Sequence, residues 1–237
     1  MISSMRFSSL LILFSAAAAM AVDPTSGKKL TFSDDFNGDA LDDSKWVVEG
    51  KKEAISIVKG GKDKVLRISL VQSADMIQGN GISTKGKFEQ LFGYFEASMR
   101  MNAYKGHTGY LRLGPADGKA IPNTLVLFEG LGGDSLHPWM RTVNDNGQHD
   151  YRPEGKMTQF LKAGEASKKF NTYGLLCSEK SYIWYVNGKQ VHKVDRVEMK
   201  LPVNITFSHR VAEFERPSLN LKQLPDDVDI DWVKVWK

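Results

Sequence analysis

The stretch YIWYVNGKQVHKV (residues 182–194) predicts two β-strands joined by a tight turn. Its first five residues, Tyr182–Val186, are aromatic or β-branched, which is typical of a strand packed in a sheet. The Asn187-Gly188 pair that follows tolerates positive φ at both positions, as a primed two-residue turn requires. A second β-rich run, Gln190–Val194, comes after the turn. The stretch therefore predicts a β-hairpin.

Similar β-rich runs recur between glycine-rich connectors, whereas long helical patterns are absent after the N-terminal segment. Further strands are expected at residues 65–71, 93–101, 125–128, 203–207 and 228–236. Such short strands between turn signals are typical of an all-β sandwich. The polar segment 148–169 is expected to hold a loop or one short helix. Because no repeat or linker divides the chain, residues 22–237 are expected to form one domain.

Residues 1–21 have the order of a secretory signal peptide. A positive charge at Arg6 precedes an apolar run from Leu10 to Phe14, and small residues stand at Ala19 and Ala21. A membrane anchor is the alternative, but this run is shorter than the ~20 apolar residues that cross a bilayer. We therefore expect cleavage after Ala21 and secretion, into either the extracellular space or the periplasm.

The composition argues against several classes of partner. The formal net charge of +4 comes from 32 basic and 28 acidic residues without a basic run, which disfavours a nucleic-acid partner. No later apolar stretch is long enough to cross a membrane, so no membrane partner is expected. Cys177 is the single cysteine, which excludes an intramolecular disulfide and favours a packing role. The protein is expected to be a monomer.

Four blocks of the sequence resemble glycoside hydrolase family 16, in the order in which that family has them. They are FSDDFNG (32–38) with Leu41-Asp42 and Ser44-Lys45-Trp46, ISTKGKF (82–88) with GYFEA (93–97), FNTYGL (170–175) with WYVNG (184–188), and Leu224-Pro225 with DWVKV (231–235). The resemblance covers nearly all of the chain after residue 21. It implies a concanavalin A-like jelly roll, a β-sandwich of two curved antiparallel sheets with a polysaccharide cleft on the concave face. Laminarinase- and β-glucanase-like members of the family hydrolyse O-glycosyl bonds in such polysaccharides.

The family's catalytic strand carries a Glu, an Asp two residues on, and a second Glu three residues later, which a bulge returns to the same face. Retaining glycosidases use two carboxyls about 5–5.5 Å apart as nucleophile and acid/base. In the matching segment, TLVLFE (124–129), Thr124 occupies the nucleophile position and Val126 that of the Asp. Only Glu129 remains, at the acid/base position. Threonine has no activating base here and valine carries no proton, so ordinary retaining hydrolysis is not expected.

The resemblance also implies which residues line the cleft. Alternation places Tyr110 and Arg112 on one face of their strand, where the ring can stack on a sugar and the guanidinium can bind a carboxylate or sulfate. The expected substrate-binding residues are Tyr110, Arg112, Trp139, Arg141, Asn144, His209, Arg210 and Phe214. Core packing is the alternative for Trp139, whereas for His209 a structural role is the favoured interpretation and substrate binding the alternative. Two carboxylates of the motif are missing, so the charge of the cleft becomes more positive. Together with Arg112, Arg141 and Arg210, this predicts a preference for an acidic polysaccharide.

The family resemblance further implies a structural calcium site on the convex face, with Asp35, the carbonyl of Gly61 and Asp231 as the matching ligands. Such oxygen ligands suit calcium, although acidic residues also lie near one another on ordinary surfaces. No cofactor is expected otherwise, and this calcium stays the open alternative.

Three functions remain open at this point. The first is a secreted relative of the hydrolases that binds a polysaccharide with weakened or lost catalysis. The second is an active retaining endo-glycosidase in which Glu129 works with another carboxylate, such as Glu213 or Asp134. The third is a structural extracellular module without a glycan site. The missing carboxylates favour the first or the third.

Overall fold

A computed structural model describes residues 23–60, 63–73, 76–115, 123–132, 136–144, 147–151, 161–162, 164–195 and 200–237. The expected signal peptide, Gly61 and Asp134 lie outside these residues, as do the side chains of residues 123–127 and Asn144. Among the described residues, no helix has the length and apolar character needed to span a bilayer.

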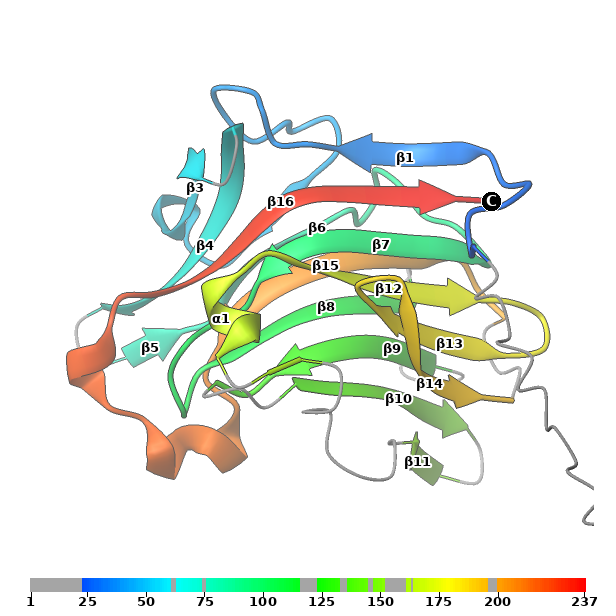
Figure 1. Ribbon diagram of the computed structural model, residues 1–237. Helices are drawn as coiled ribbons and strands as arrows, with labels where there is room; N and C mark the ends of the chain where they lie inside the picture. Colours follow the sequence, from blue (N-terminus) through cyan, green and yellow to red (C-terminus); the bar gives the residue numbers. More distant parts are fainter. Residues whose placement is uncertain are drawn as a thin grey trace, which may run out of the picture.

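Antiparallel pairing organises the strands into two sheets (Figure 1). The first has nine strands, in the order β14 (Lys189–Val194), β13 (Tyr182–Val186), β12 (Asn171–Cys177), β7 (Gly93–Arg100), β16 (Asp226–Trp236), β4 (Asp63–Ser73) and β3 (Ile55–Gly60), with β1 (Leu30–Asp34) paired to β16 and β5 (Met76–Gln78) paired to β4. The second has seven, in the order β11 (Gly147–Tyr151), β10 (Leu136–Asn144), β9 (Asn123–Gly130), β8 (Thr108–Pro115), β15 (Val203–Arg210), β6 (Asn80–Ser83) and β2 (Val47–Glu49). The short helices in the described part of the chain are η1 (Lys52–Ala54), α1 (Glu165–Lys168), η3 (Glu213–Ser218) and η4 (Leu221–Gln223). The predicted all-β sandwich is confirmed.

The predicted hairpin is present as β13 and β14. Asn187 and Gly188 have φ values of 49° and 73°, and Val186 pairs with Lys189 across the turn. Each of the other expected strands lies within or overlaps a strand of the structure. The segment 148–169 differs from its prediction, because it contributes residues to β11 in addition to the short helix α1.

The hydrophobic core lies between the two sheets and follows from alternation along the strands. Leu111 on β8, Phe128 on β9 and Met140 on β10 are fully buried in it, as is Cys177, whose packing role is thereby confirmed. Burial also raises the pKa of the Cys177 thiol, so the thiol is protonated and unreactive at neutral pH. Residues that alternate with these core positions on β8, β9 and β10 face outward, which is where the candidate site lies.

Candidate functional site

Tyr110 and Glu129 face each other across β8 and β9 on the outer face of the seven-stranded sheet. They are directly paired in the register, and each alternates with a core residue, Leu111 or Phe128. Both are nearly buried in spite of their outward direction, with exposed fractions of 6% for Tyr110 and 4% for Glu129. A carboxylate in such a place is costly unless it is hydrogen-bonded.

Trp139 supplies a hydrogen bond to this carboxylate from the neighbouring strand β10. Its Nε1 donates to Oε2 of Glu129 at 3.1 Å, and the indole is 7% exposed. The indole therefore fixes the orientation of Glu129 and adds a second aromatic ring to the same face. Polysaccharide sites use aromatic rings and hydrogen-bonding groups in this combination, because sugar rings have both apolar faces and hydroxyl edges.

Two arginines lie against the ring of Tyr110. The guanidinium carbon of Arg112 is 5.6 Å from the ring centroid, and that of Arg210, on β15, is 4.9 Å away. Nη2 of Arg112 also donates to Oγ1 of Thr206 at 3.3 Å. Neither arginine has an ion-pair partner among the described residues. The face around Tyr110 therefore presents two guanidinium groups without a described ion pair beside an aromatic ring.

Arg141 differs from these two arginines. It forms a bidentate ion pair with Asp150 on β11, at 2.7 and 2.9 Å, while its guanidinium lies 4.9 Å from the centroid of the Trp139 ring. Hydrogen bonds to Asp150 are the main cause of a raised Arg141 pKa, and the charge of Glu129 adds to it. The prediction that Arg141 carries an uncompensated charge is therefore wrong. The sequence missed Asp150 because β11 was not expected.

The strand β9 pairs without interruption, unlike the bulged strand that the family spacing predicts. Residues 123–130 pair one by one with β10, and residues 126–130 pair one by one with β8. Residues 125 and 127 thus occupy positions on the face of Glu129. Residues 124 and 126 occupy positions on the opposite face, where Leu113 and Met140, the partners of residue 126, are fully buried. In this register the two positions that would accompany Glu129 hold Leu125 and Leu127.

His209 is not part of this face, and its expected substrate-binding role is wrong. It lies on β15, where it pairs with Gly109 of β8 one position away from the outward-facing Ser208, and it is completely buried between the sheets. Its Nδ1 donates to the carbonyl of Ile68 at 3.3 Å. Burial lowers its pKa to about 4, with Asp226 acting in the opposite direction. His209 is therefore neutral at pH 7.

The remaining predicted ligand residues are more dispersed. Phe214 is 67% exposed on η3, outside both sheets. Asn144 is the last residue of β10. For calcium, Asp35 directly follows β1, which pairs with β16, the strand that contains Asp231. Asp35 is exposed and its Oδ1 accepts from Asn37 N, whereas Asp231 accepts from Ser98. These contacts do not test calcium binding, so the calcium site stays a prediction.

The chain is similar to known proteins in both sequence and fold. The family model described as "Glycosyl hydrolases family 16" matches residues 43–234. The chain belongs to glycosyl hydrolase family 16. A curated relative, the endo-1,3-1,4-beta-glycanase ExsH of Rhizobium meliloti (strain 1021), is 30% identical over 140 residues, which are 55% of this chain but only 29% of that protein.

Solved structures of family 16 proteins have the same fold. The mixed-linkage glucan family 16 protein of Bacteroides ovatus, in complex with a product, has a TM-score of 0.72 at 17% identity, over 86% of this chain and 99% of that one. The laminarinase of Flavobacterium sp. UMI-01 has a TM-score of 0.72 at 18% identity, over 88% and 100%. At these identities the likeness supports the fold and leaves the activity to be argued from the residues.

Proposed function

We propose that this family 16 protein binds a polysaccharide on the outer face of its seven-stranded sheet and has lost most or all hydrolytic activity. The register of β9 carries this proposal. In this register the nearest position of β9 on the face of Glu129 is residue 127, a leucine in the sequence, whereas a retaining mechanism needs a second carboxylate about 5–5.5 Å away. A single carboxylate can hydrogen-bond a sugar but cannot serve as both nucleophile and acid/base.

The aromatic and cationic residues favour binding over a purely structural module. Tyr110 and Trp139 lie on the face of Glu129, and Arg112 and Arg210 lie against Tyr110. An outward-facing arginine without an acidic partner contributes little to folding stability, but it is well suited to bind an anionic or hydroxyl-rich ligand. The B. ovatus relative, whose structure holds a glucan product, supports a polysaccharide as the ligand class.

An active endo-glycosidase is the second candidate, supported by the names of the relatives. It requires a partner carboxylate for Glu129. Glu213 stands on η3, with its side chain 84% exposed and paired with Arg216 at 3.1 Å. Asp134 lies outside the described residues. An exposed Glu213 that is paired with Arg216 is poorly suited to act with the buried Glu129, so binding without cleavage is favoured.

Loss of the Tyr110 ring is expected to weaken glycan binding about 10-fold, because an aromatic platform contributes on the order of 1 kcal/mol beyond its buried area. Affinity electrophoresis of Tyr110→Ala against soluble polysaccharides measures this. Trp232→Ala is the matched control, since Trp232 lies on the nine-stranded sheet under Lys234. Equal loss in both variants, or no binding by the unmodified protein, would contradict the proposed site.

Secretion is part of the same proposal and rests on the order of charged, apolar and small residues in 1–21. Expression of the full chain in a bacterium with an export pathway is expected to give a mature protein that begins at Val22. N-terminal sequencing of the purified protein checks this. An intact Met1 in a cell-associated fraction would overturn the export assignment.

A further inference from the structure

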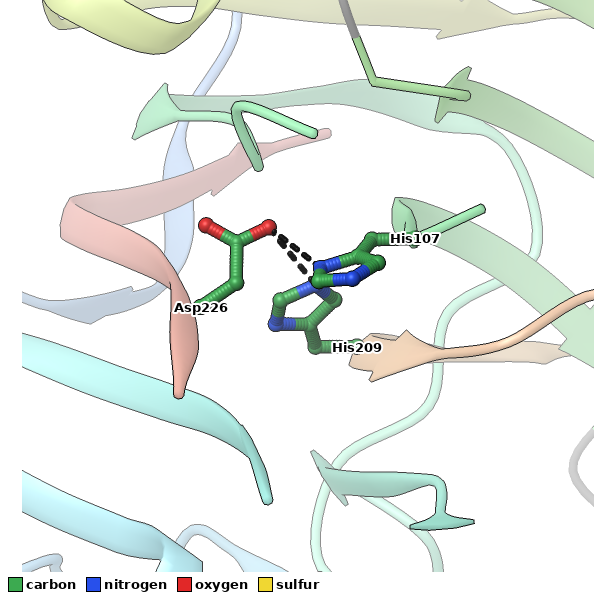
Figure 2. Close-up of side chains that lie close together, drawn as sticks. All are labelled: His107, His209 and Asp226. Carbon is green, nitrogen blue, oxygen red and sulfur yellow. Dashed lines mark hydrogen bonds and ion pairs between the residues drawn. The ribbon is translucent and has the colours of Figure 1, made fainter. Parts of the chain in front are cut away.

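Three residues from distant parts of the chain meet between the two sheets: His107, His209 and Asp226 (Figure 2). His107 directly precedes β8, His209 lies on β15, and Asp226 begins β16. The two histidines are fully buried, and Asp226 is 7% exposed. The cluster therefore joins the seven-stranded sheet to the nine-stranded sheet, on the inner side of the strands that carry Tyr110 and Arg210.

Each of the three side chains has one potential ligand atom close to those of the other two. Oδ2 of Asp226 is 2.7 Å from Nδ1 of His107 and 3.7 Å from Nε2 of His209, and all three atoms lie within 4.8 Å of one another. Tetrahedral zinc with bonds of 2.0–2.1 Å holds its ligand atoms about 3.3 Å apart. The observed separations to Asp226 lie on either side of this spacing, so shifts of about half an ångström bring both into a coordination shell.

The hydrogen bonds of His209 leave an electron pair facing the carboxylate. Because Nδ1 is within 3.3 Å of the Ile68 carbonyl, which only accepts, the ring proton resides on Nδ1. Nε2 is then unprotonated and has no hydrogen-bond partner among the described residues, although it faces Oδ2 of Asp226. Burial disfavours a second proton on the ring. Oδ2 of Asp226 is also hydrogen-bonded to Nδ1 of His107 at 2.7 Å. A metal cation that displaces the proton of this hydrogen bond to solvent would lie among three electron-rich atoms and stabilise them.

Outer contacts hold the three residues in this orientation. Oδ1 of Asp226 accepts from the Ala103 amide at 3.5 Å, which leaves Oδ2 for the cluster. Asn102 donates to the His107 carbonyl at 2.7 Å and accepts from the Gly109 amide at 2.8 Å, so the backbone on both sides of His107 is fixed. A carbonyl on the far nitrogen of a ligating histidine is the usual support of a metal centre.

We propose that Nδ1 of His107, Nε2 of His209 and Oδ2 of Asp226 bind a divalent transition-metal ion of the zinc class. Two imidazole nitrogens and one carboxylate oxygen match the ligand preferences of zinc, and they differ from the all-oxygen set expected for calcium. The ion acts as a structural cross-link between the sheets. The single cysteine means that no intramolecular disulfide can take this role.

The proposed cross-link also supports the glycan-binding face. His107 is three residues before Tyr110, and His209 directly precedes Arg210. An ion that fixes both residues to β16 therefore restrains the ends of β8 and β15 that present the ring and the guanidinium. This inference does not depend on glycan binding, because metal content and folding stability are measured without a glycan.

The test uses the mature protein purified without a polyhistidine tag. After removal of metals by a chelator, the protein is titrated with Zn²⁺ and, separately, with Co²⁺. We expect stoichiometric binding and a visible absorption band typical of Co²⁺ with three protein ligands and one water. We also expect the melting temperature to rise by roughly 5–10 °C when zinc is 100-fold above its Kd. Absence of binding and an unchanged melting temperature would overturn the proposal and leave a proton-linked structural cluster.

Variants locate the ion. His209→Ala and Asp226→Asn are each expected to weaken Co²⁺ binding at least about 10-fold, since loss of a group that only hydrogen-bonds to a ligand already costs roughly 10–100-fold. His192→Ala is the matched control, because His192 lies on β14 against Trp184, outside the cluster. Loss of binding in the His192 variant equal to that in the other two would contradict the assignment. If His209→Ala does not fold, Asp226→Asn and the spectrum of the unmodified protein decide the question.

Discussion

The double variant Leu125→Glu/Leu127→Asp is expected to hydrolyse β-1,3- or β-1,4-glucan at least about 100-fold faster than the unmodified protein. The uninterrupted pairing of β9 places positions 125 and 127 on the face of Glu129, because every second residue of the strand lies on the same face. The carboxylate at position 127, about 7 Å along the strand from Glu129, would supply the second member of the pair that a retaining mechanism needs, and the one at position 125 would tune it through its charge. Release of reducing sugar, measured at equal protein concentration, is the readout, and circular dichroism verifies that the variant folds.

The double variant Thr124→Glu/Val126→Asp is the matched comparison. It restores the sequence spacing of the family's carboxylates but does not put them on the face of Glu129. In the observed register these positions lie opposite to Glu129, where a carboxylate would enter the core beside Leu113 and Met140. This variant is expected to be inactive and destabilised, since a buried unpaired charge is costly. Activity in this pair, and none in the other, would show that β9 carries the bulge after all.

The unmodified protein supplies the baseline of the same experiment. Its rate on both glucans is expected to equal the background without enzyme, and Glu129→Gln is expected to leave that rate unchanged. In the active double variant, Glu129→Gln is expected to abolish the gain, because Glu129 then acts as acid/base. Hydrolysis by the unmodified protein that disappears in Glu129→Gln would instead establish the endo-glycosidase alternative.

The comparison of sequence and structure shows which features local patterns can predict. Alternation and turn residues were sufficient for the β13–β14 hairpin and for Tyr110 beside Arg112, because these depend on neighbours in the chain. The register of β9 could not be predicted from the sequence. The spacing of residues 124, 126 and 129 fits the face of Glu129 only if the strand is bulged, and a bulge is decided by pairing with β8 and β10.

Contacts between distant segments account for the other differences. Asp150 could not be assigned to Arg141 because the stretch Gly147–Tyr151 is polar and carries no strand pattern, yet it pairs along β10. His209 was expected on the outer face, but its neighbour Ser208 faces Tyr110 and the alternation turns His209 inward. The meeting of His107, His209 and Asp226 depends on the packing of one sheet on the other, which no local spacing encodes.

An acidic polysaccharide is expected to bind more tightly than a neutral glucan, and this preference rests on the proposed glycan site. Arg112 and Arg210 flank Tyr110 without an acidic partner among the described residues. A hydrogen bond between charged groups contributes about 1.5–3 kcal/mol, so Arg112→Gln and Arg210→Gln are each expected to weaken binding of a sulfated or uronic polymer about 10-fold or more. Titration calorimetry at low and high salt measures this, and salt is expected to weaken the interaction.

Arg141→Gln is the matched control for these arginines, because the charge of Arg141 is already compensated by Asp150 at 2.7 Å. Its loss is expected to change the affinity for the acidic polymer much less than the loss of Arg112 or Arg210. A neutral glucan should bind the three variants with nearly equal affinity, because it carries no anionic group that an arginine could bind. Equal affinity of the unmodified protein for acidic and neutral polymers, without salt dependence, would remove the acidic preference. The stacking role of Tyr110 would stand, because it acts on the apolar face of any sugar ring.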